Sequence, residues 1–99
     1  MHTMDYIRLM KYHTWNNEKN DLLKYERGVS FEDVLYYIEH GNLMAIIKHP
    51  NNKKYPDQKI YIVNIDNYVY LIPFVETDDE IFLKTIIPSR KATKKYLED

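Results

Sequence analysis

The chain has no cysteine and only two glycines, Gly28 and Gly41, among its 99 residues. Without cysteine it can form no disulfide framework, which fits a reducing compartment. Two isolated glycines cannot build the glycine-rich loops that hold nucleotide phosphates. The composition therefore excludes disulfide-rich secreted domains and enzymes of the dinucleotide-binding or P-loop type.

Long apolar segments are also absent from the sequence. No stretch approaches the roughly 18 to 20 consecutive apolar residues that a membrane span needs. The amino-terminal segment carries Asp5 and Arg8 where a secretory signal would have an apolar core. We expect a cytoplasmic protein with a single domain, residues 1–99, because this length with 44% hydrophobic residues supports one core and not two.

The usual patterns of metal sites and serine nucleophiles are missing as well. The four histidines show no pairing at helical spacing and have no cysteine to join them, so we expect no metal and no other cofactor. Ser30 and Ser89 lack the Gly-x-Ser-x-Gly pattern that surrounds a serine nucleophile. Both stand where a helix should begin, which makes them candidate helix caps.

Hydrophobic periodicity predicts helices in the first half of the chain. Asn16 or Asn17 should cap a first helix that ends at Gly28. Ser30 and Asp33 have the spacing of a capping box for a second helix, which should end at the next glycine. Apolar residues at offsets of three, four and seven give this second helix one hydrophobic stripe.

Four later segments have the β-branched and aromatic content of strands. They are Leu43 to Lys48, Ile60 to Ile65, Tyr68 to Val75 and Ile81 to Ile87. Partial alternation from Tyr6 to Trp15 suggests one more strand, and Pro73 predicts a bulge or an unpaired amide. The predicted class is α+β, with two N-terminal helices packed on one face of a four- or five-stranded antiparallel sheet and a short C-terminal helix beyond it.

The C-terminal segment is the most informative part of the chain, because an apolar strand there runs into a short basic helix. Pro88 should stop the strand, Ser89 cap the helix and Arg90 begin it. Cations at the amino end of a helix oppose its dipole, at a cost of a few tenths to about 1 kcal/mol each. Free amides beside Arg90 and Lys91 suit a bound phosphate, whereas a solvated terminal helix is the simpler alternative.

Basic residues are segregated although the formal net charge is only −1. The chain has no acid from Ile81 to Leu97, and a second basic cluster lies around the polar loop from His49 to Gln58. If the two clusters converge on one side of the sheet, they can bind an RNA backbone, and tyrosines can stack on unpaired bases. The RNA-binding candidates are Lys48, Lys53, Lys54, Tyr55, Lys91, Lys94 and Lys95.

Cleavage of RNA through its own 2′-hydroxyl needs a base, donors for the charge that grows on phosphate, and an acid, but no metal. Arg90 is the candidate stabiliser, because its guanidinium is bidentate and always charged. Lys84, on the last predicted strand, can assist it. His49 is a candidate for proton transfer because histidine titrates near neutrality, although a lone loop histidine is more often simply exposed. A lysine or a tyrosine is the alternative.

Three stretches of the chain carry a family likeness: Trp15, Lys19 and Gly28-Val29-Ser30-Phe31; the paired strands from Lys59 to Val75; and Ile86-Ile87-Pro88-Ser89-Arg90-Lys91-Ala92-Thr93-Lys94. In this order they resemble the BrnT toxins of bacterial type II toxin–antitoxin systems, which have a RelE-like fold. The C-terminal stretch is similar to the family's Ile-Ile-Ser-Ala-Arg-x-Ala-Thr ending, and Lys59 stands where the family usually has an arginine. The likeness covers the chain from about Trp15 to the end.

The resemblance implies a metal-independent endoribonuclease that inhibits translation and is neutralised by a small antitoxin protein in a hetero-oligomer. Lys59, at the family's arginine position, would then assist Arg90 and Lys84. The positions at which the chain departs from the family are Leu23, Glu26, Arg27, Lys59 and Tyr96.

Because of these departures, two further hypotheses stand beside the toxin. The second is a non-catalytic RelE-fold module that binds a small antitoxin-like partner or RNA without cleaving it. The third is a plain nucleic-acid-binding domain with no antitoxin, whose binding should fall steeply with salt.

Overall fold

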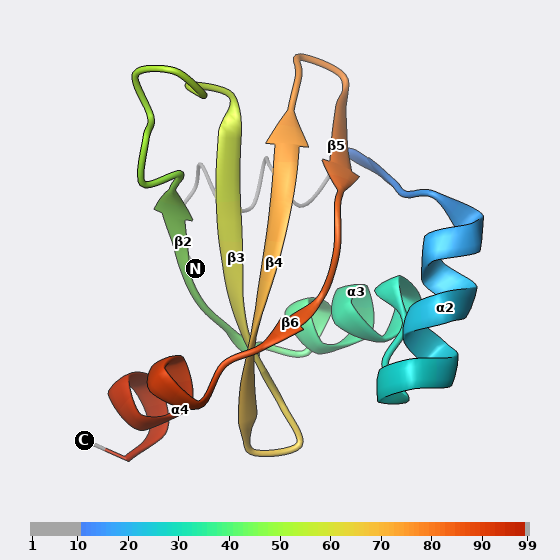
Figure 1. Ribbon diagram of the computed structural model, residues 1–99, viewed down its shortest axis with the longest axis vertical. Helices are drawn as coiled ribbons and strands as arrows, with labels where there is room; N and C mark the ends of the chain where they lie inside the picture. The colour runs from blue at the N-terminus through green and yellow to red at the C-terminus, as the bar shows by residue number, and fades with distance from the viewer. Residues whose placement is uncertain (1–10, 99) are drawn as a thin grey trace.

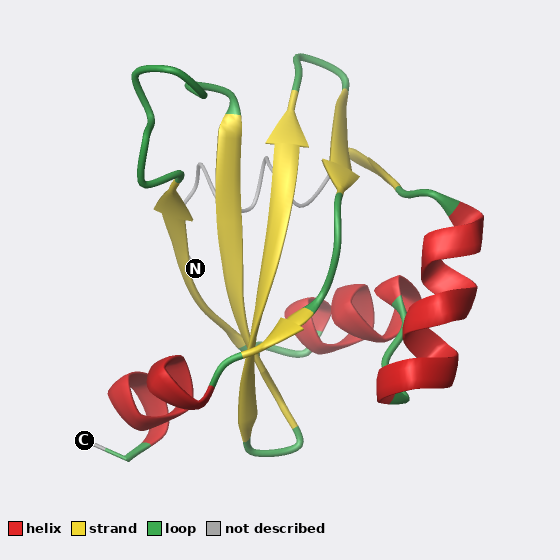
Figure 2. Cartoon of the chain, viewed as in Figure 1, coloured by secondary structure: helices red, strands yellow, loops and turns green. Residues whose placement is uncertain are grey.

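Three helices flank a six-stranded sheet in residues 11–98, which are the residues that the computed structural model describes (Figures 1 and 2). The α+β class is therefore confirmed, as is the order of two early helices and one at the end. None of these three helices is long and apolar enough to cross a membrane. The helices are α2 (Asn17–Arg27), α3 (Phe31–Glu39) and α4 (Arg90–Leu97). The strands are β1 (Tyr12–Thr14), β2 (Leu43–Lys48), β3 (Gln58–Ile65), β4 (Tyr68–Glu76), β5 (Glu80–Leu83) and β6 (Ile87–Pro88).

The two early helices begin at caps that the sequence specifies. Asn16 Oδ1 accepts the Lys19 N–H at 2.9 Å at the start of α2. At α3, Ser30 Oγ accepts the Asp33 N–H at 3.0 Å, and Asp33 Oδ2 accepts the Ser30 N–H at 2.9 Å. Gly28 leaves α2 with a φ of 69°, which glycine adopts without steric cost. Both predicted helices and the capping box are confirmed.

The sheet is mixed, which corrects the prediction of a four- or five-stranded antiparallel sheet. Its order is β1-β5-β4-β3-β2, with β1 parallel to β5, the other neighbours antiparallel, and β6 paired with β4. Because α2 and α3 separate β1 from the meander, the chain can place β1 on the far side of β5, where it runs parallel. The predicted strand from Tyr6 to Trp15 is β1 in its described part, and its residues 6–10 lie outside the described residues.

Pro73 explains why the predicted strand Ile81 to Ile87 divides into β5 and β6. Its carbonyl accepts the Lys84 N–H at 2.8 Å, so its nitrogen also faces the β5 edge of β4. Proline has no N–H to donate at that point, and the ladder cannot continue. The chain then buries Ile86 and pairs again with β4 through Ile87 and Pro88.

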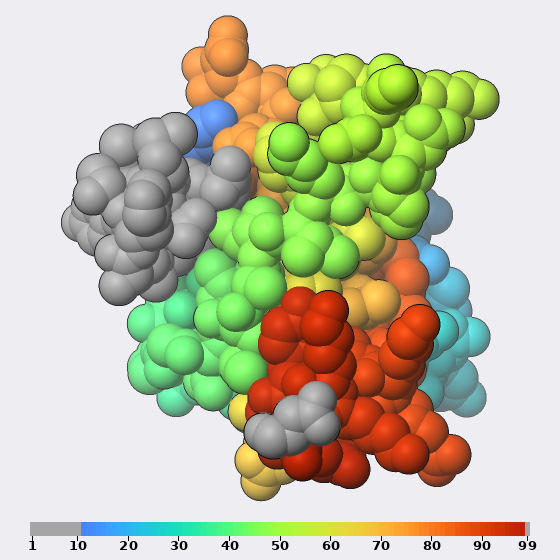
Figure 3. Space-filling view, turned by 90° about the vertical axis from the view of Figure 1, so that its left-hand side faces the viewer, coloured from blue at the N-terminus to red at the C-terminus, as the bar shows by residue number. Residues whose placement is uncertain are grey.

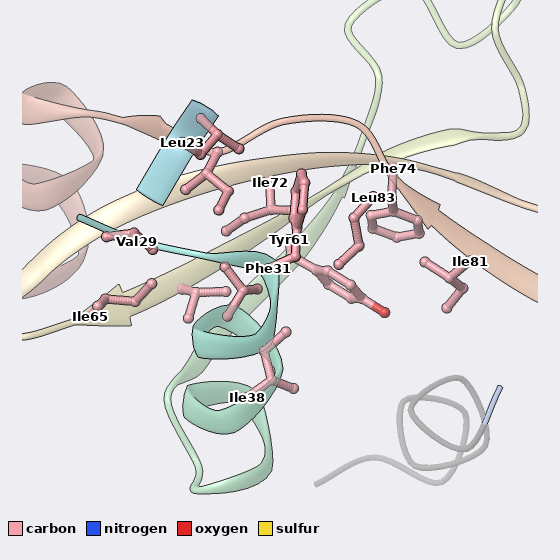
Figure 4. Close-up of a cluster of buried hydrophobic side chains, with 13 residues drawn as sticks. Leu23, Val29, Phe31, Ile38, Tyr61, Ile65, Ile72, Phe74, Ile81 and Leu83 are labelled. Carbon is pink, nitrogen blue, oxygen red and sulfur yellow. The ribbon is translucent and has the colours of Figure 1, made fainter. Parts of the chain in front are cut away.

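The main core lies between the sheet and the early helices (Figure 4). Phe31 and Leu23 from the helices contact a sheet face that carries Tyr61 and Phe74, and all four are at most 2% exposed. Asn20 connects the two helices within this layer, because its Oδ1 accepts the Phe31 N–H at 2.7 Å. The packing fixes one face of the sheet as interior and leaves the other for the C-terminal helix.

Candidate nucleic-acid interface

Helix α4 packs on the opposite face of the sheet, where a smaller apolar cluster includes Ile62, Val69 and Ala92. Ser89 Oγ caps the helix by accepting the Ala92 N–H at 3.0 Å, as the sequence predicts. Thr93 joins helix to sheet: its Oγ1 donates to the Ser89 carbonyl at 2.7 Å and accepts the Val69 N–H at 2.9 Å. These bonds set the position from which Arg90 projects.

Replacing Thr93 with valine should lower the free energy of unfolding by about 1–3 kcal/mol, because the buried Val69 N–H then has no acceptor. Urea unfolding followed by circular dichroism measures the change. Thr85→Val is the matched control, since the Thr85 hydroxyl makes no hydrogen bond within the described chain, and it should change stability by less than about 0.5 kcal/mol. An equal loss in both variants would contradict this role of Thr93.

The basic side chains of α4 lie on its solvent side. Ala92 and Thr93 are buried against the sheet, and the helix has no acid in its first turn. Arg90 makes no ion pair within residues 11–98, so no described acid competes with a ligand for its guanidinium. The exposed basic residues of this helix are Arg90, Lys91, Lys94 and Lys95.

Helix α4 covers only part of its face of the sheet. Ile62 and Leu71 lie beneath it, whereas Ile47 and Phe82 are 41% and 37% exposed. Side chains alternate along a strand, so residues two apart point to the same face of the sheet. Two neighbouring cross-strand rows therefore share the face that carries Ile62 and Leu71: Ile47, Ile60 and Pro73 form one row, and Gln58, Val75 and Phe82 form the next. Lys84 follows β5 on the same face. We call this surface the open face, defined by Ile47, Gln58, Ile60, Pro73, Val75, Phe82 and Lys84.

The loop between β2 and β3 borders the open face at its other end. His49 donates its backbone N–H to the Gln58 carbonyl at 3.1 Å, which extends the ladder into the loop. The His49 and Tyr55 rings lie 4.8 Å apart, and Lys54 Nζ is 5.4 Å from the Tyr55 ring centroid. Lys53 is exposed beside them. The loop therefore brings together three of its predicted RNA-binding residues with His49.

The two basic clusters border the same face but do not meet. In Figure 1 the loop between β2 and β3 lies at one end of the strands and α4 at the other. Figure 3 shows both on one side of the molecule, with the surface of the strands between them. The clusters are thus visible together from the β2 side of the molecule, but they lie at opposite ends of the strands and are not brought together in one place. Lys84 lies between the clusters, with its Nζ 3.5 Å from Gln58 Oε1.

Lys59 lies on the opposite side of the sheet from Arg90 and Lys84. Its Nζ pairs with Glu76 Oε1 at 3.1 Å, and Lys11 Nζ pairs with Glu76 Oε2 at 3.0 Å. Lys59 is two residues from the buried Tyr61 of the main core, and strand alternation puts both on one face. Its cross-strand partner Lys48 shares this side. The structure therefore separates Lys48 and Lys59 from the other predicted residues.

His13 belongs to the same polar group on the interior side. Its Nδ1 lies 2.9 Å from the Lys11 carbonyl, and its Nε2 lies 3.2 Å from the Tyr61 hydroxyl. A carbonyl can only accept, so Nδ1 carries the proton in the neutral ring and Nε2 accepts from Tyr61. Burial lowers the pKa of His13, partly opposed by the Lys11 carbonyl, Glu39 and Glu76.

The lowered pKa of His13 predicts a loss of stability on mild acidification. The unfolded chain takes up this proton near pH 6.5 and the folded one only at lower pH, so the contribution is complete above about pH 6.5 and declines below it. Urea midpoints should fall between pH 7.5 and pH 5, and less so in His13→Gln. The control is His40→Gln, at an exposed position. Identical pH profiles for the wild type and His13→Gln would contradict the prediction.

A surface hollow of about 330 Å³ lies beside β1 and the early helices, and His13 is part of its lining. Asn20 Nδ2 donates to the Glu32 carboxylate at 2.7 Å and lowers its pKa. None of the residues that the sequence predicts for RNA binding or catalysis lines the hollow. Its lining residues are Tyr12, His13, Thr14, Trp15, Asn17 and Glu32.

Sequence reasoning did not identify Phe82, Gln58 or the anchoring role of Thr93. A signal for Phe82 exists, because it is two residues from Lys84 in the predicted strand Ile81 to Ile87 and so shares its face. The groups of histidine and carboxylate residues in positions 11–98 include none that can hold a metal ion. Comparisons of the chain with protein-family profiles, with curated proteins and with solved structures found no match.

Proposed function

We propose that this chain is a toxin-like endoribonuclease of a type II toxin–antitoxin system, with a RelE-like fold, that binds a single RNA strand across the open face. The observation that carries the proposal is the position of Arg90. It begins a capped helix beside the open face, is exposed, and makes no ion pair within residues 11–98. A guanidinium in such a position suits bidentate contact with a phosphate.

In the proposed reaction the 2′-hydroxyl of RNA attacks the adjacent phosphorus and the 5′-oxygen leaves. Arg90 stabilises the charge that grows on the phosphate oxygens, and Lys84 assists from the open face. The cations of α4 and of the loop hold the strand on either side, supplying affinity without sequence information. Lys59 has no part in this arrangement, because it pairs with Glu76 on the other side of the sheet.

The proposed reaction also needs one group that takes the proton from the 2′-hydroxyl and one that gives a proton to the leaving oxygen. His49 Nδ1 accepts the Asn51 N–H at 3.0 Å, so the neutral ring carries its proton on Nε2. In this state His49 can donate a hydrogen bond toward the leaving oxygen, but it has no free lone pair to act as base. This observation favours a second candidate function, a non-catalytic module that binds RNA or an antitoxin-like partner on the same face.

An antitoxin would have to cover the open face and the cations at its two ends. An amphipathic helical segment with acidic residues fits both needs, since Ile47 and Phe82 are exposed apolar side chains between basic ends. We propose a hetero-oligomer with such a protein. Co-expression with the product of an adjacent short reading frame tests it: a stable complex that no longer binds RNA supports the proposal, and independent purification contradicts it.

The function is tested by expressing the chain alone in bacteria, beside Arg90→Ala, and by incubating both purified proteins with cellular RNA and with translating ribosomes. An active toxin should arrest growth and degrade RNA, and the variant should do neither. Absence of RNA loss above the variant overturns catalysis. If RNA binding is retained in that case, the non-catalytic module is the correct function.

A further inference from the structure

Phe82 exposes an aromatic ring on the open face, at the β5 side of the sheet. Phe82 is 37% exposed as a residue, and its cross-strand neighbour is Val75, itself only partly buried. Ile47, on the other side of the same face, is 41% exposed. An apolar surface of this kind, bordered by polar side chains, usually contacts a ligand or partner. The charges that surround it indicate which kind.

Two polar side chains accompany the Phe82 ring. Gln58 lies two strands away in the same cross-strand row, through Val75, and Lys84 lies two residues further along the chain on the same face. Lys84 Nζ reaches Gln58 Oε1 at 3.5 Å, the limit of a hydrogen bond. Lys84 Nζ and Gln58 Oε1 can therefore exchange this weak contact for hydrogen bonds to a ligand at a small cost in free energy. No described acid pairs with Lys84.

We infer, on the basis of the proposed function, that Phe82 stacks against one unpaired base of a bound single strand. An unpaired nucleotide has a flat apolar base, a hydrogen-bonding edge and a phosphate. The open face offers one group to each part: the Phe82 ring to the base, the Gln58 amide, which both donates and accepts, to the edge of the base, and the Lys84 cation to the phosphate. The site thus selects single strands over duplexes, because a paired base cannot reach the ring.

The test uses a fluorescent oligothymidylate of about ten nucleotides, which lacks the 2′-hydroxyl and so cannot be cleaved by that route. It is compared with an abasic strand of equal length and charge, and with the corresponding duplex, by fluorescence anisotropy. The wild type should bind the thymidylate roughly 5-fold to 100-fold more tightly than the abasic strand. Phe82→Ala should lose this difference, and Phe82→Tyr should keep it.

Two further variants separate this inference from the proposed function. Tyr25→Ala removes an aromatic ring that is 90% exposed on α2, away from the open face, and should bind like the wild type. Arg90→Ala should weaken binding to the thymidylate and to the abasic strand alike. Suppose that Arg90→Ala weakens binding, but that Phe82→Ala still binds the thymidylate more tightly than the abasic strand by the wild-type factor. Stacking on Phe82 is then overturned, and the proposed function stands. If the wild type binds no strand, both fall.

Discussion

Arg90→Ala should reduce the rate of RNA cleavage by about 100-fold to 1,000-fold, the usual cost of removing one donor that stabilises charge in a transition state. Arg90 is exposed and makes no ion pair within the described chain, so the substitution should leave the fold unchanged. Removing a cation from the amino end of α4 should even raise the free energy of unfolding by a few tenths of a kcal/mol. Loss of activity with a slight gain of stability is the expected signature.

Single-turnover cleavage of a labelled RNA, followed by gel electrophoresis, measures the effect. Lys94→Ala is the matched control, because it removes a cation from the solvent side of the same helix without touching its first turn. It should slow cleavage only a few-fold, and this effect should shrink at high salt, where each phosphate contact contributes less. Arg90→Lys keeps the charge without the bidentate geometry and should fall between the two. Equal rates for Arg90→Ala and Lys94→Ala would remove Arg90 from the reaction.

Local sequence signals predict most of the fold because they act over a few residues. The caps Asn16, Ser30 and Ser89 accept the hydrogen bonds that their residue types predict. The turn at Asp66 and Asn67 has φ values of 53° and 64°, a conformation that these two residue types tolerate better than most. Strand β2 has the predicted bounds, because the period of its apolar residues changes sharply after Gly41.

The sheet topology could not be predicted in the same way, because it depends on contacts between distant segments. Nothing within Tyr12–Thr14 indicates that this strand pairs in parallel with β5. The division of β5 from β6 arises from Pro73, on a neighbouring strand. Pro73 predicts an irregularity in its own strand. Its effect on the next strand depends on the register between the two strands, which places Lys84 opposite it.

Sequence patterns indicated which residues to consider for the candidate site, but not how these residues are arranged in space. Arg90 and the basic loop were found by composition, which is independent of the fold. Lys59 was carried over from the family likeness, but strand alternation places it with Glu76 on the interior side. Counting in steps of two from Tyr61 places Lys59 on the interior face once Tyr61 is known to be buried, but burial of a tyrosine is not evident from sequence alone. The face on which Lys84 lies depends in addition on the register between β4 and β5.

Phe31→Ala should lower the free energy of unfolding by about 3–5 kcal/mol, the range for removing a fully buried phenylalanine. Phe31 is 0% exposed, begins α3, and stacks on Trp15 with ring centroids 5.6 Å apart. Truncation leaves a cavity where α2, α3 and the sheet meet. Domains of this size are usually stable by about 5–15 kcal/mol, so the variant should be partly unfolded at 37 °C.

Phe82→Ala removes the same ring from the open face and is the matched control. Because Phe82 is 37% exposed and has no helix above it, the substitution should cost well under half as much as Phe31→Ala in urea unfolding monitored by circular dichroism. The pair tests the roles that we propose for the two faces of the sheet: the interior face holds the fold together, and the open face binds a ligand. Comparable losses in the two variants would mean that Phe82 is structural and that the open face is part of the core.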